Sequence, residues 1–377
     1  MVRPVGAPGG LRILSFPATL KIVTPLHIGT GHDALRNGFD YVVDRTTGEV
    51  QIIDVDRALA DLTDEEIAKA RDGRIASALG QARRESCLIT SYRLRREGDL
   101  DELRPTMRDP LSGKAMVPGS SLKGAMRTAL LGSIVAPEGS AHPTQRPAIE
   151  ALAAVAPTAL GREATPQNRD LMRAVRISDF ILERGQTDLF DVAVERLRPR
   201  PGEASGIPMW VEAIAPGAIL HGTISIEQET PLRRAADPPA ARAFGGILVA
   251  TLRKRAAAIA RYERAAHDQA GATAHPLFAL IEAAESEGPT YVNVGWGSGW
   301  HAKTIYPEYT AIDATAAQQV AQAGWAEQLR RRRMPPDTPI PRPYPSSRRI
   351  ARRSDQSYPM GWVTVRTEHR VLYPRAP

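Results

Sequence analysis

Apolar and polar residues alternate in several short stretches of the sequence, and this pattern predicts β-strands. The first stretch, residues 11–23, ends in a loop over residues 24–33 that contains two glycines and a proline. The two clearest strands, residues 209–213 and 218–227, are joined at Ala215-Pro216-Gly217. A hairpin is expected over residues 39–53. Further strands are expected over residues 87–94, 174–178, 189–197, 291–294 and 362–371.

Apolar residues spaced three and four apart predict helices. One helix is expected to have Ser120 as its N-cap, because Pro118-Gly119 interrupts the chain just before it. Its apolar residues then share one face: Leu122, Ala125, Met126, Ala129 and Leu130. The other predicted helices cover residues 54–78 with a break near Thr63, 244–262, 276–284 and 314–333.

Strands and helices follow one another without a regular strand–helix–strand rhythm. This favours an α+β fold with antiparallel sheets over a doubly wound parallel sheet. The 377 residues are enough for two domains or one large one. The single cysteine, Cys87, excludes an internal disulfide and a cysteine-based zinc cluster. No stretch predicts a membrane span or a secretory signal, so we expect a cytoplasmic protein.

Positive charge is concentrated in one segment. Residues 330–353 contain nine arginines and one acidic residue, Asp337, whereas the whole chain has a formal net charge of +7. The rest of the chain is therefore close to neutral. Clustered arginine is typical of a surface that binds a polyanion, most often nucleic acid. The alternative is a basic loop that only keeps the chain hydrated.

The start of the Ser120 helix is a candidate phosphate site. Free N–H groups at a helix N-terminus favour anions, and Gly119, Ser120 and Ser121 occupy this position. Lys123 and Arg127 follow four residues apart, so both cations lie on one side of the first two turns. The alternative is an ordinary capped helix whose charged side chains face water.

A second candidate is the glycine loop, residues 295–299. Gly295, Gly297 and Gly299 allow backbone N–H groups to approach a ligand closely. The spacing matches neither Gly-x-Gly-x-x-Gly nor a P-loop, so an enzyme that uses a nucleotide cofactor is not indicated. A tight crossing of two packed elements would also explain these glycines.

Aromatic and basic residues flank the glycine loop. Trp296 and Trp300 are suited to stack on bases, and His301 and Lys303 are suited to reach phosphate. Together with Ser298 inside the loop, they suggest an RNA contact.

The loop over residues 24–33 contains His27, His32 and Asp33 close to Gly29 and Gly31. Three interpretations follow: a metal site, acid–base cleavage of RNA by Asp33 or a histidine, or polar caps on a glycine-containing loop. A metal site lacks further ligands at a suitable spacing elsewhere, and we expect no metal and no cofactor.

Taken together, these motifs resemble those of the RAMP superfamily of CRISPR-associated proteins. The resemblance rests on Pro118-Gly119-Ser120-Ser121-Leu122-Lys123-Gly124 with Arg127, on Thr24-Pro25-Leu26-His27-Ile28-Gly29-Thr30-Gly31, and on the glycine loop. The glycine loop and residues 358–363 are similar to those of one kind of subunit. That subunit ends the backbone filament of the type III-A (Csm) effector at the 3′ side of the guide RNA. The resemblance covers residues 16–371.

The resemblance implies a pair of ferredoxin-like (RRM-like) modules with antiparallel sheets and helical insertions. We expect the first module over residues 11–200, with a helical insertion near residues 137–167. The second would cover residues 201–377 and contain the glycine loop and the basic segment 330–353. The expected RNA contacts are His27, Gly29, Gly31, Gly119, Ser120, Ser121, Lys123, Arg127, Gly295, Trp296, Gly297, Ser298, Gly299, His301 and Lys303.

The resemblance also implies a function without catalysis. Such a subunit would bind the 3′ part of the CRISPR RNA (crRNA), cap the filament and support maturation of the crRNA 3′ end in antiviral defence. Its partners would be crRNA, other Csm-type backbone subunits and host nucleases that trim the 3′ end, with no membrane. The alternative is a metal-dependent endoribonuclease, because an aspartate in the related repeating subunit cleaves target RNA and Asp33 lies in a comparable place.

Overall fold

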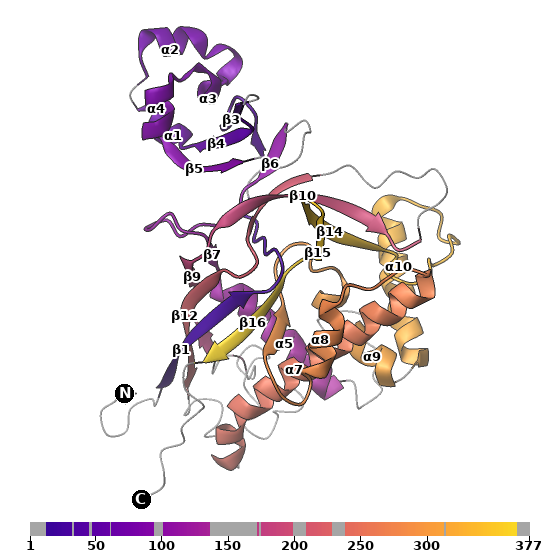
Figure 1. The fold of residues 1–377 in the computed structure, drawn as a ribbon. Helices are drawn as coiled ribbons and strands as arrows, with labels where there is room; N and C mark the ends of the chain where they lie inside the picture. The colour runs from indigo at the N-terminus through magenta and orange to yellow at the C-terminus, as the bar shows by residue number, and fades with distance from the viewer. Residues whose placement is uncertain are drawn as a thin grey trace, which may run out of the picture.

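The computed structural model describes residues 13–31, 34–44, 47–60, 62–93, 101–135, 172, 175–198, 209–227, 238–312 and 314–367. A main body built on two β-sheets carries a smaller lobe that projects from one end (Figure 1). The predicted α+β fold with antiparallel sheets is confirmed, because β6 with β11 is the one parallel strand pair in the described part of the chain. No helix among these residues is long and apolar enough to cross a membrane.

The first sheet is built around β1 (Ile13–Ile22). This strand pairs antiparallel with β12 (Ile219–Glu227) on one side and β16 (Trp362–Thr367) on the other, so Leu20 lies opposite both Leu220 and Val365. The sheet has seven strands, of which the other four are β13 (Thr290–Asn293), β9 (Phe180–Arg184), β7 (Met116–Val117) and β8 (Val175–Ile177). The predicted alternation holds, because every second residue of β1 from Phe16 to Ile22 is buried.

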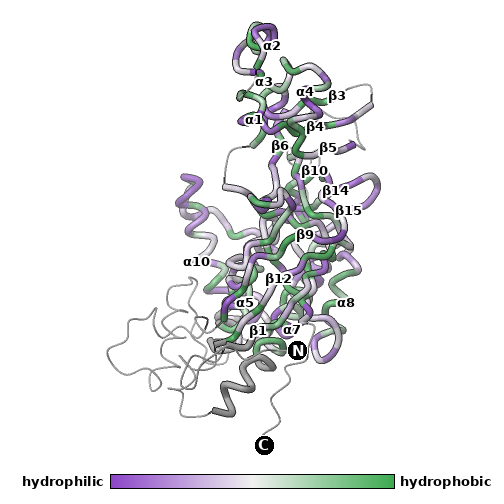
Figure 2. Tube along the Cα trace, turned by 90° about the vertical axis from the view of Figure 1, so that its left-hand side faces the viewer, coloured by the Kyte–Doolittle hydropathy of each residue, from purple (hydrophilic) through white to green (hydrophobic). Residues whose placement is uncertain are grey.

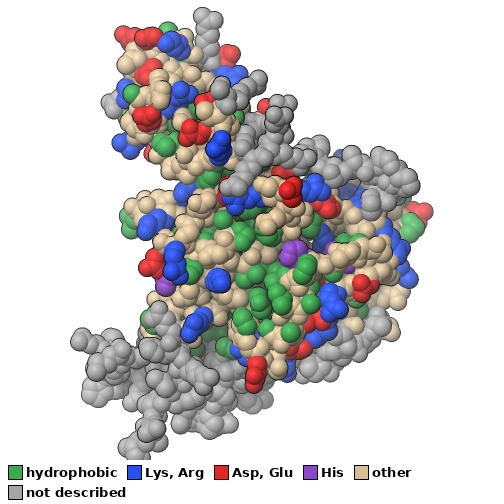
Figure 3. Space-filling view, in the orientation of Figure 1, with side chains coloured by type: hydrophobic (Ala, Val, Ile, Leu, Met, Phe, Trp, Pro, Cys, Tyr) green, Lys and Arg blue, Asp and Glu red, His purple; other side chains and the backbone are tan. Residues whose placement is uncertain are grey.

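Two helices cover the buried face of this sheet. Leu122 and Met126 of α5 (Gly119–Val135) and Leu248 and Leu252 of α7 (Pro238–Ala270) belong to the same core as the strands. Figure 2 shows hydrophobic residues running along β1, β9 and β12 in the middle of the main body. Helix α7 also contacts α8 (Leu277–Ala283) and α9 (Tyr306–Ile312), which are followed by α10 (Ala314–Arg332). On the face drawn in Figure 3, hydrophobic side chains gather over the middle of the main body.

The second sheet takes strands from widely separated parts of the chain. Its six strands, in order, are β15 (Gln356–Pro359), β14 (Ser347–Arg353), β10 (Thr187–Arg196), β11 (Met209–Ile214), β6 (Glu102–Arg104) and β2 (Leu35–Arg36). Strands β11 and β12 both form where the sequence predicts strands. They follow one another in the chain yet lie in different sheets, so the turn at Ala215-Pro216-Gly217 carries the chain from one sheet to the other.

The projecting lobe contains the predicted hairpin. Strands β3 (Tyr41–Asp44) and β4 (Glu49–Ile53) pair antiparallel, and β5 (Leu88–Arg93) adds a third strand. The predicted break at Thr63 is confirmed, because Thr63 and Glu66 form a reciprocal capping box. A further break at Asp72, whose φ is 58°, was not predicted. The lobe's helices are α1 (Val55–Leu59), α2 (Asp64–Lys69), α3 (Ile75–Ala78) and α4 (Gln81–Ser86).

Some boundaries differ from those expected. The Ser120 helix begins at Gly119, so Ser120 lies in its first turn instead of capping it, and β9 was not predicted. The first sheet combines β1 with strands from beyond residue 200, and the division into two ferredoxin-like modules at that residue remains a prediction. The predicted helical insertion near residues 137–167 lies outside the described residues.

Candidate nucleic-acid interface

The loop over residues 24–31 and the glycine loop are far apart in the sequence but lie against each other. The N–H of Trp296 donates to the carbonyl oxygen of His27 over 2.9 Å, and these residues form an antiparallel bridge. Gly295 has a φ of +85°, and a Cβ there would lie 2.7 Å from the same oxygen. Only glycine fits this crossing without displacing the neighbouring loop. At position 295 the structure therefore shows the tight crossing that the sequence left open as an alternative.

His27 supports this crossing from inside the protein. Only 2% of its surface is exposed. Its Nδ1 lies 2.7 Å from the carbonyl oxygen of Glu212, and its ring meets Trp296 edge-on with centroids 5.6 Å apart. Burial lowers the pKa of His27, so the imidazole is neutral near pH 7. This placement argues against the expected contact between the His27 side chain and RNA.

The end of the same loop reaches the surface. Gly29 and Gly31 are both exposed; Gly29 forms an antiparallel bridge with Thr106, and Gly31 has open space around it. The other two candidates of this loop, His32 and Asp33, lie outside the described residues.

The glycine loop has one face fixed and part of its backbone accessible. The buried hydroxyl of Ser298 donates to the carbonyl oxygen of Gly295 over 2.8 Å and closes the turn. Gly297 lies against Met360, and Gly299 lies against His301. Both glycines remain partly exposed, so a ligand can approach their backbone.

Cations gather beside Trp296. The guanidinium carbon of Arg349 lies 4.7 Å from the centre of the Trp296 ring in a cation–π contact. The pKa of Lys303 is lowered mainly by partial burial and further by the nearby charge of Arg349. The pKa of Arg349 is lowered mainly by partial burial and further by the charge of Arg104. No carboxylate of the described residues pairs with these three cations. Their mutual repulsion favours the binding of an anion.

Arg104 was not a candidate in the sequence. It lies in β6, a strand of three residues whose parallel pairing with β11 places Arg104 opposite Val211. That pairing joins residues more than 100 positions apart, and neither local alternation nor a motif indicates it.

The start of α5 differs from the expected open phosphate site. The N–H of Gly119 donates to Asp179 Oδ1 over 2.9 Å, so a carboxylate of the protein already takes one of the amides expected to hold phosphate. A Cβ at position 119 would collide with the carbonyl oxygen of Ile177, which explains the glycine. Ser120 is exposed and Ser121 is half-buried. The helix is therefore positioned by the adjoining segment, and only part of its N-terminus is open.

The basic residues of α5 form a cluster of their own. Lys123 and Arg127 are half-buried. Burial and then the charges of Arg127 and Arg176 lower the pKa of Lys123. Helix α5 also contacts the single turn η5 (His301–Lys303), so this cluster and the cations beside Trp296 are carried by adjacent elements. A phosphate group at the cluster would relieve the repulsion among its charges.

Glu263 of α7 organises the residues behind the glycine loop. Its side chain is 3% exposed and lies 2.9 Å from His301 Nε2 and 2.8 Å from Arg348 Nε. Burial alone would raise the pKa of Glu263, but the charges of His301 and Arg348 outweigh burial and hold it far below its usual range. His301 is thus a buried ion-pair partner, which argues against the phosphate contact expected of it.

Most of the basic segment 330–353 is built into the fold. Residues from Ser347 onward form β14 in the second sheet. Five of the nine arginines pair with carboxylates: Arg330 and Arg331 with Glu327, Arg348 with Glu263, Arg352 with Glu195, and Arg353 with Asp188. The segment is therefore not a detached basic loop, and its charge is less available to RNA than its composition suggests.

Arg255 of α7 fixes the turn that carries Lys303. Its side chain is buried and donates from Nη2 to the carbonyl oxygens of Ala302 over 2.9 Å and Thr304 over 2.7 Å. The other arm of the guanidinium pairs with Glu308. One planar side chain thus holds several points of the turn at once.

The comparisons with known proteins agree with this architecture. The family model of the RAMP superfamily matches residues 19–237. A chain in the cryo-EM structure of a Csm–crRNA–target RNA ternary complex of a type III-A CRISPR-Cas system superposes with a TM-score of 0.63. The two chains are 21% identical, and the alignment covers 93% of this chain and 100% of that one.

A second solved structure also superposes over most of the chain. The crystal structure of T. onnurineus Csm5 gives a TM-score of 0.55 at 19% identity and covers 92% of this chain and 99% of that one. No curated protein matches the sequence. At these identities the two structural matches establish a shared fold.

Proposed function

This chain belongs to the RAMP superfamily, and from that premise we propose that it is a non-catalytic RNA-binding subunit of a type III-A CRISPR effector complex. It would bind the 3′ part of crRNA in the cytoplasm and end the filament of backbone subunits. Its place at that end would allow host nucleases to mature the crRNA 3′ end in antiviral defence. The two structural neighbours carry Csm in their names and align over nearly their whole length, which supports this choice within the superfamily.

The observation that carries the proposal is the group of cations around the glycine loop. Lys303, Arg349 and Arg104 have no carboxylate partner among the described residues. Arg349 lies over the ring of the partly exposed Trp296, and the charges of Lys303 and Arg104 lie near Arg349. Cations suit phosphates, and a partly exposed aromatic ring suits a base.

This combination fits a guide RNA better than a defined RNA sequence. The guide part of a crRNA differs from one crRNA to the next, so a protein that holds it must contact the backbone and the faces of bases. Phosphate contacts and stacking both meet this requirement, since every base has a face. Lys303, Arg349 and Arg104 are donors only, which suits the acceptor oxygens of phosphates.

Reconstitution of the whole complex tests the proposal. The protein would be assembled with the other type III-A subunits of its organism and a guide RNA that carries 4-thiouridine near its 3′ end or near its 5′ end. We expect the protein to enter the complex and to crosslink to the 3′ probe after irradiation. Crosslinking only to the 5′ probe, or a complex that forms without this chain, would contradict the proposal.

The same assembly separates a scaffold from a nuclease. With Mg²⁺ and a complementary target RNA, a non-catalytic subunit leaves cleavage unchanged when Asp33 is replaced in the Asp33→Ala variant. Target cleavage that is lost with Asp33→Ala while RNA binding persists would instead favour the endoribonuclease alternative. The purified protein alone serves as the control, because any cleavage it performs cannot come from another subunit.

A further inference from the structure

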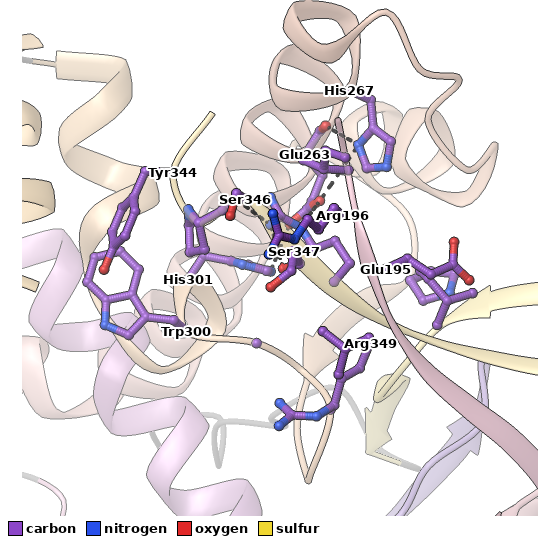
Figure 4. A pocket seen from close by; sticks show the side chains of 18 of the residues that line it. Glu195, Arg196, Glu263, His267, Trp300, His301, Tyr344, Ser346, Ser347 and Arg349 are labelled. Carbon is purple, nitrogen blue, oxygen red and sulfur yellow. Dashed lines mark hydrogen bonds and ion pairs between the residues drawn. The ribbon is translucent and has the colours of Figure 1, made fainter. Parts of the chain in front are cut away.

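A cleft of about 1110 Å³ lies beside the glycine loop and was not foreseen from the sequence (Figure 4). Its walls come from the end of β10, from α7 and α10, from the strands β14 and β15 and from the segment between α10 and β14. Gly297, Ser298 and Gly299 form part of one wall. The cleft is therefore continuous with the candidate interface.

Aromatic side chains line one part of the cleft. Figure 4 shows Trp300 and Tyr344 next to each other. Their ring centroids are 5.3 Å apart, and the ring centroids of Trp325 and Tyr344 are 6.2 Å apart. Trp300 and Trp325 are both partly exposed. Aromatic rings that keep one side accessible are the usual platforms for unpaired bases.

Two arginines without carboxylate partners also line the cleft, and they come from different elements. Arg332 ends α10 and Arg349 lies in β14. Both are exposed, and neither forms an ion pair within the part of the chain that the structure describes. Arg330 and Arg331, by contrast, pair with Glu327 and are not part of the lining. Two further arginines of the lining, Arg348 and Arg352, pair with Glu263 and Glu195.

Buried polar atoms that find no hydrogen-bond partner among the described residues line the same cleft. They are His301 Nδ1, Arg348 Nη2 and Asn293 Oδ1, on side chains that are each more than nine-tenths buried. Such atoms are rare in folded proteins and are usually satisfied by water or a ligand. Asn293 Oδ1 needs a donor, whereas Arg348 Nη2 needs an acceptor. A phosphate supplies only acceptors, but a nucleotide supplies phosphate, ribose hydroxyls and base edges.

We propose that this cleft holds unpaired nucleotides of the single-stranded RNA that crosses the glycine loop. Their bases lie against Trp300 and Trp325, and their phosphates lie near Arg332 and Arg349. The inference rests on the proposed function and adds a second contact region to it. A strand held at both places is gripped over several nucleotides, which suits a subunit that retains one end of an RNA.

A pair of arginine variants in one helix tests the cleft. Arg332→Gln removes a charge that faces the cleft, and Arg330→Gln removes the same charge two residues earlier from a side chain paired with Glu327. Affinity of the full-length protein for a labelled single-stranded RNA would be measured over a range of salt concentrations. Loss of one phosphate contact lowers the slope of log affinity against log salt by about 0.7 for a single strand. We expect this change for Arg332→Gln and an unchanged slope for Arg330→Gln.

The outcomes separate this inference from the proposed function. If the wild-type protein binds RNA and the two variants bind alike, the cleft is not a nucleotide site, while the proposed function stands. If neither the free protein nor the assembled complex binds RNA through this chain, the proposed function fails as well.

A second measurement needs no variant. RNA containing 4-thiouridine would be crosslinked to the wild-type protein, and the attached peptides would be identified by mass spectrometry. Crosslinks at Trp300, Trp325 or Tyr344 support the inference. Crosslinks confined to residues outside the cleft, including the exposed side of the glycine loop, would overturn it.

Discussion

Replacing Glu263 with glutamine tests the internal support of the interface. Glu263→Gln keeps the shape of the side chain but removes the charge that balances Arg348, whose side chain is 8% exposed. Arg348 then retains a buried positive charge without a carboxylate, and the single acceptor oxygen of glutamine replaces the two oxygens that serve His301 and Arg348. Breaking a buried ion pair by removing one partner typically costs about 3–5 kcal/mol. We expect the free energy of unfolding to fall by about this amount.

Urea denaturation followed by tryptophan fluorescence measures the loss, and Glu327→Gln is the matched control. Glu327 also contacts two arginines, Arg330 and Arg331, but its side chain is 41% exposed. Water screens these pairs, so the control should lose far less stability than Glu263→Gln. A loss for Glu263→Gln no greater than that for Glu327→Gln would refute the reasoning.

The same variant has a distinct pH dependence. The pKa of Glu263 is lower in the folded protein than in the unfolded chain, so its contribution to stability is present above the unfolded value of about 4.5. That contribution is lost as the pH falls through the range between the unfolded and folded values. The wild-type protein should therefore lose stability more steeply below pH 4.5 than Glu263→Gln does, and parallel curves would count against a charged Glu263 in the folded state.

Three further changes test the neighbouring contacts, each by urea denaturation. Gly295→Ala should lower the free energy of unfolding by about 2–4 kcal/mol, because the new Cβ meets the carbonyl oxygen of His27. Gly31→Ala, at a similar φ but in open space, should lower it by about 1 kcal/mol. Equal losses would refute the tight crossing at position 295. Burial lowers the pKa of His27, so the free energy of unfolding should fall as the pH drops below about 6.5, and His27→Gln should show a smaller fall. Arg255→Lys keeps the charge but not the paired donors, so it should lower the free energy of unfolding by about 1–3 kcal/mol. An unchanged free energy of unfolding would show that the contacts with the turn at Lys303 do not stabilise the fold.

Local patterns predicted most individual elements and the hairpin of β3 and β4, but not how the strands of the two larger sheets pair. Alternation identified β1, β11 and β12, and the capping residue Thr63 marked a helix start. The turn at Ala215-Pro216-Gly217 looks like a hairpin turn, yet β12 pairs with β1 and β11 pairs with β10. The pairing of β12 with β1 depends on residues about 200 positions away, and a local turn signal contains no information about them.

The candidate site was predicted in its loops and less well in its side chains. The sequence identified the glycine loop, the loop that contains His27 and the basic start of α5. It assigned His27 and His301 to RNA, because a histidine beside glycines gives no sign of whether it is buried. It missed Glu263, which is one of several charged residues in a helix of 33 residues, and its role depends on the tertiary contacts with His301 and Arg348.

The salt dependence of RNA binding tests the central claim most directly. Single-stranded RNA would be titrated with the wild-type protein, with the double variant Lys303→Gln and Arg349→Gln, and with a control that loses the same charge at the exposed, paired Lys69 and Arg330. The account predicts that the first double variant lowers the slope of log affinity against log salt by about 1.4, for two lost phosphate contacts, while the control keeps the wild-type slope. Equal slopes and affinities for all three proteins would contradict an RNA interface at the glycine loop.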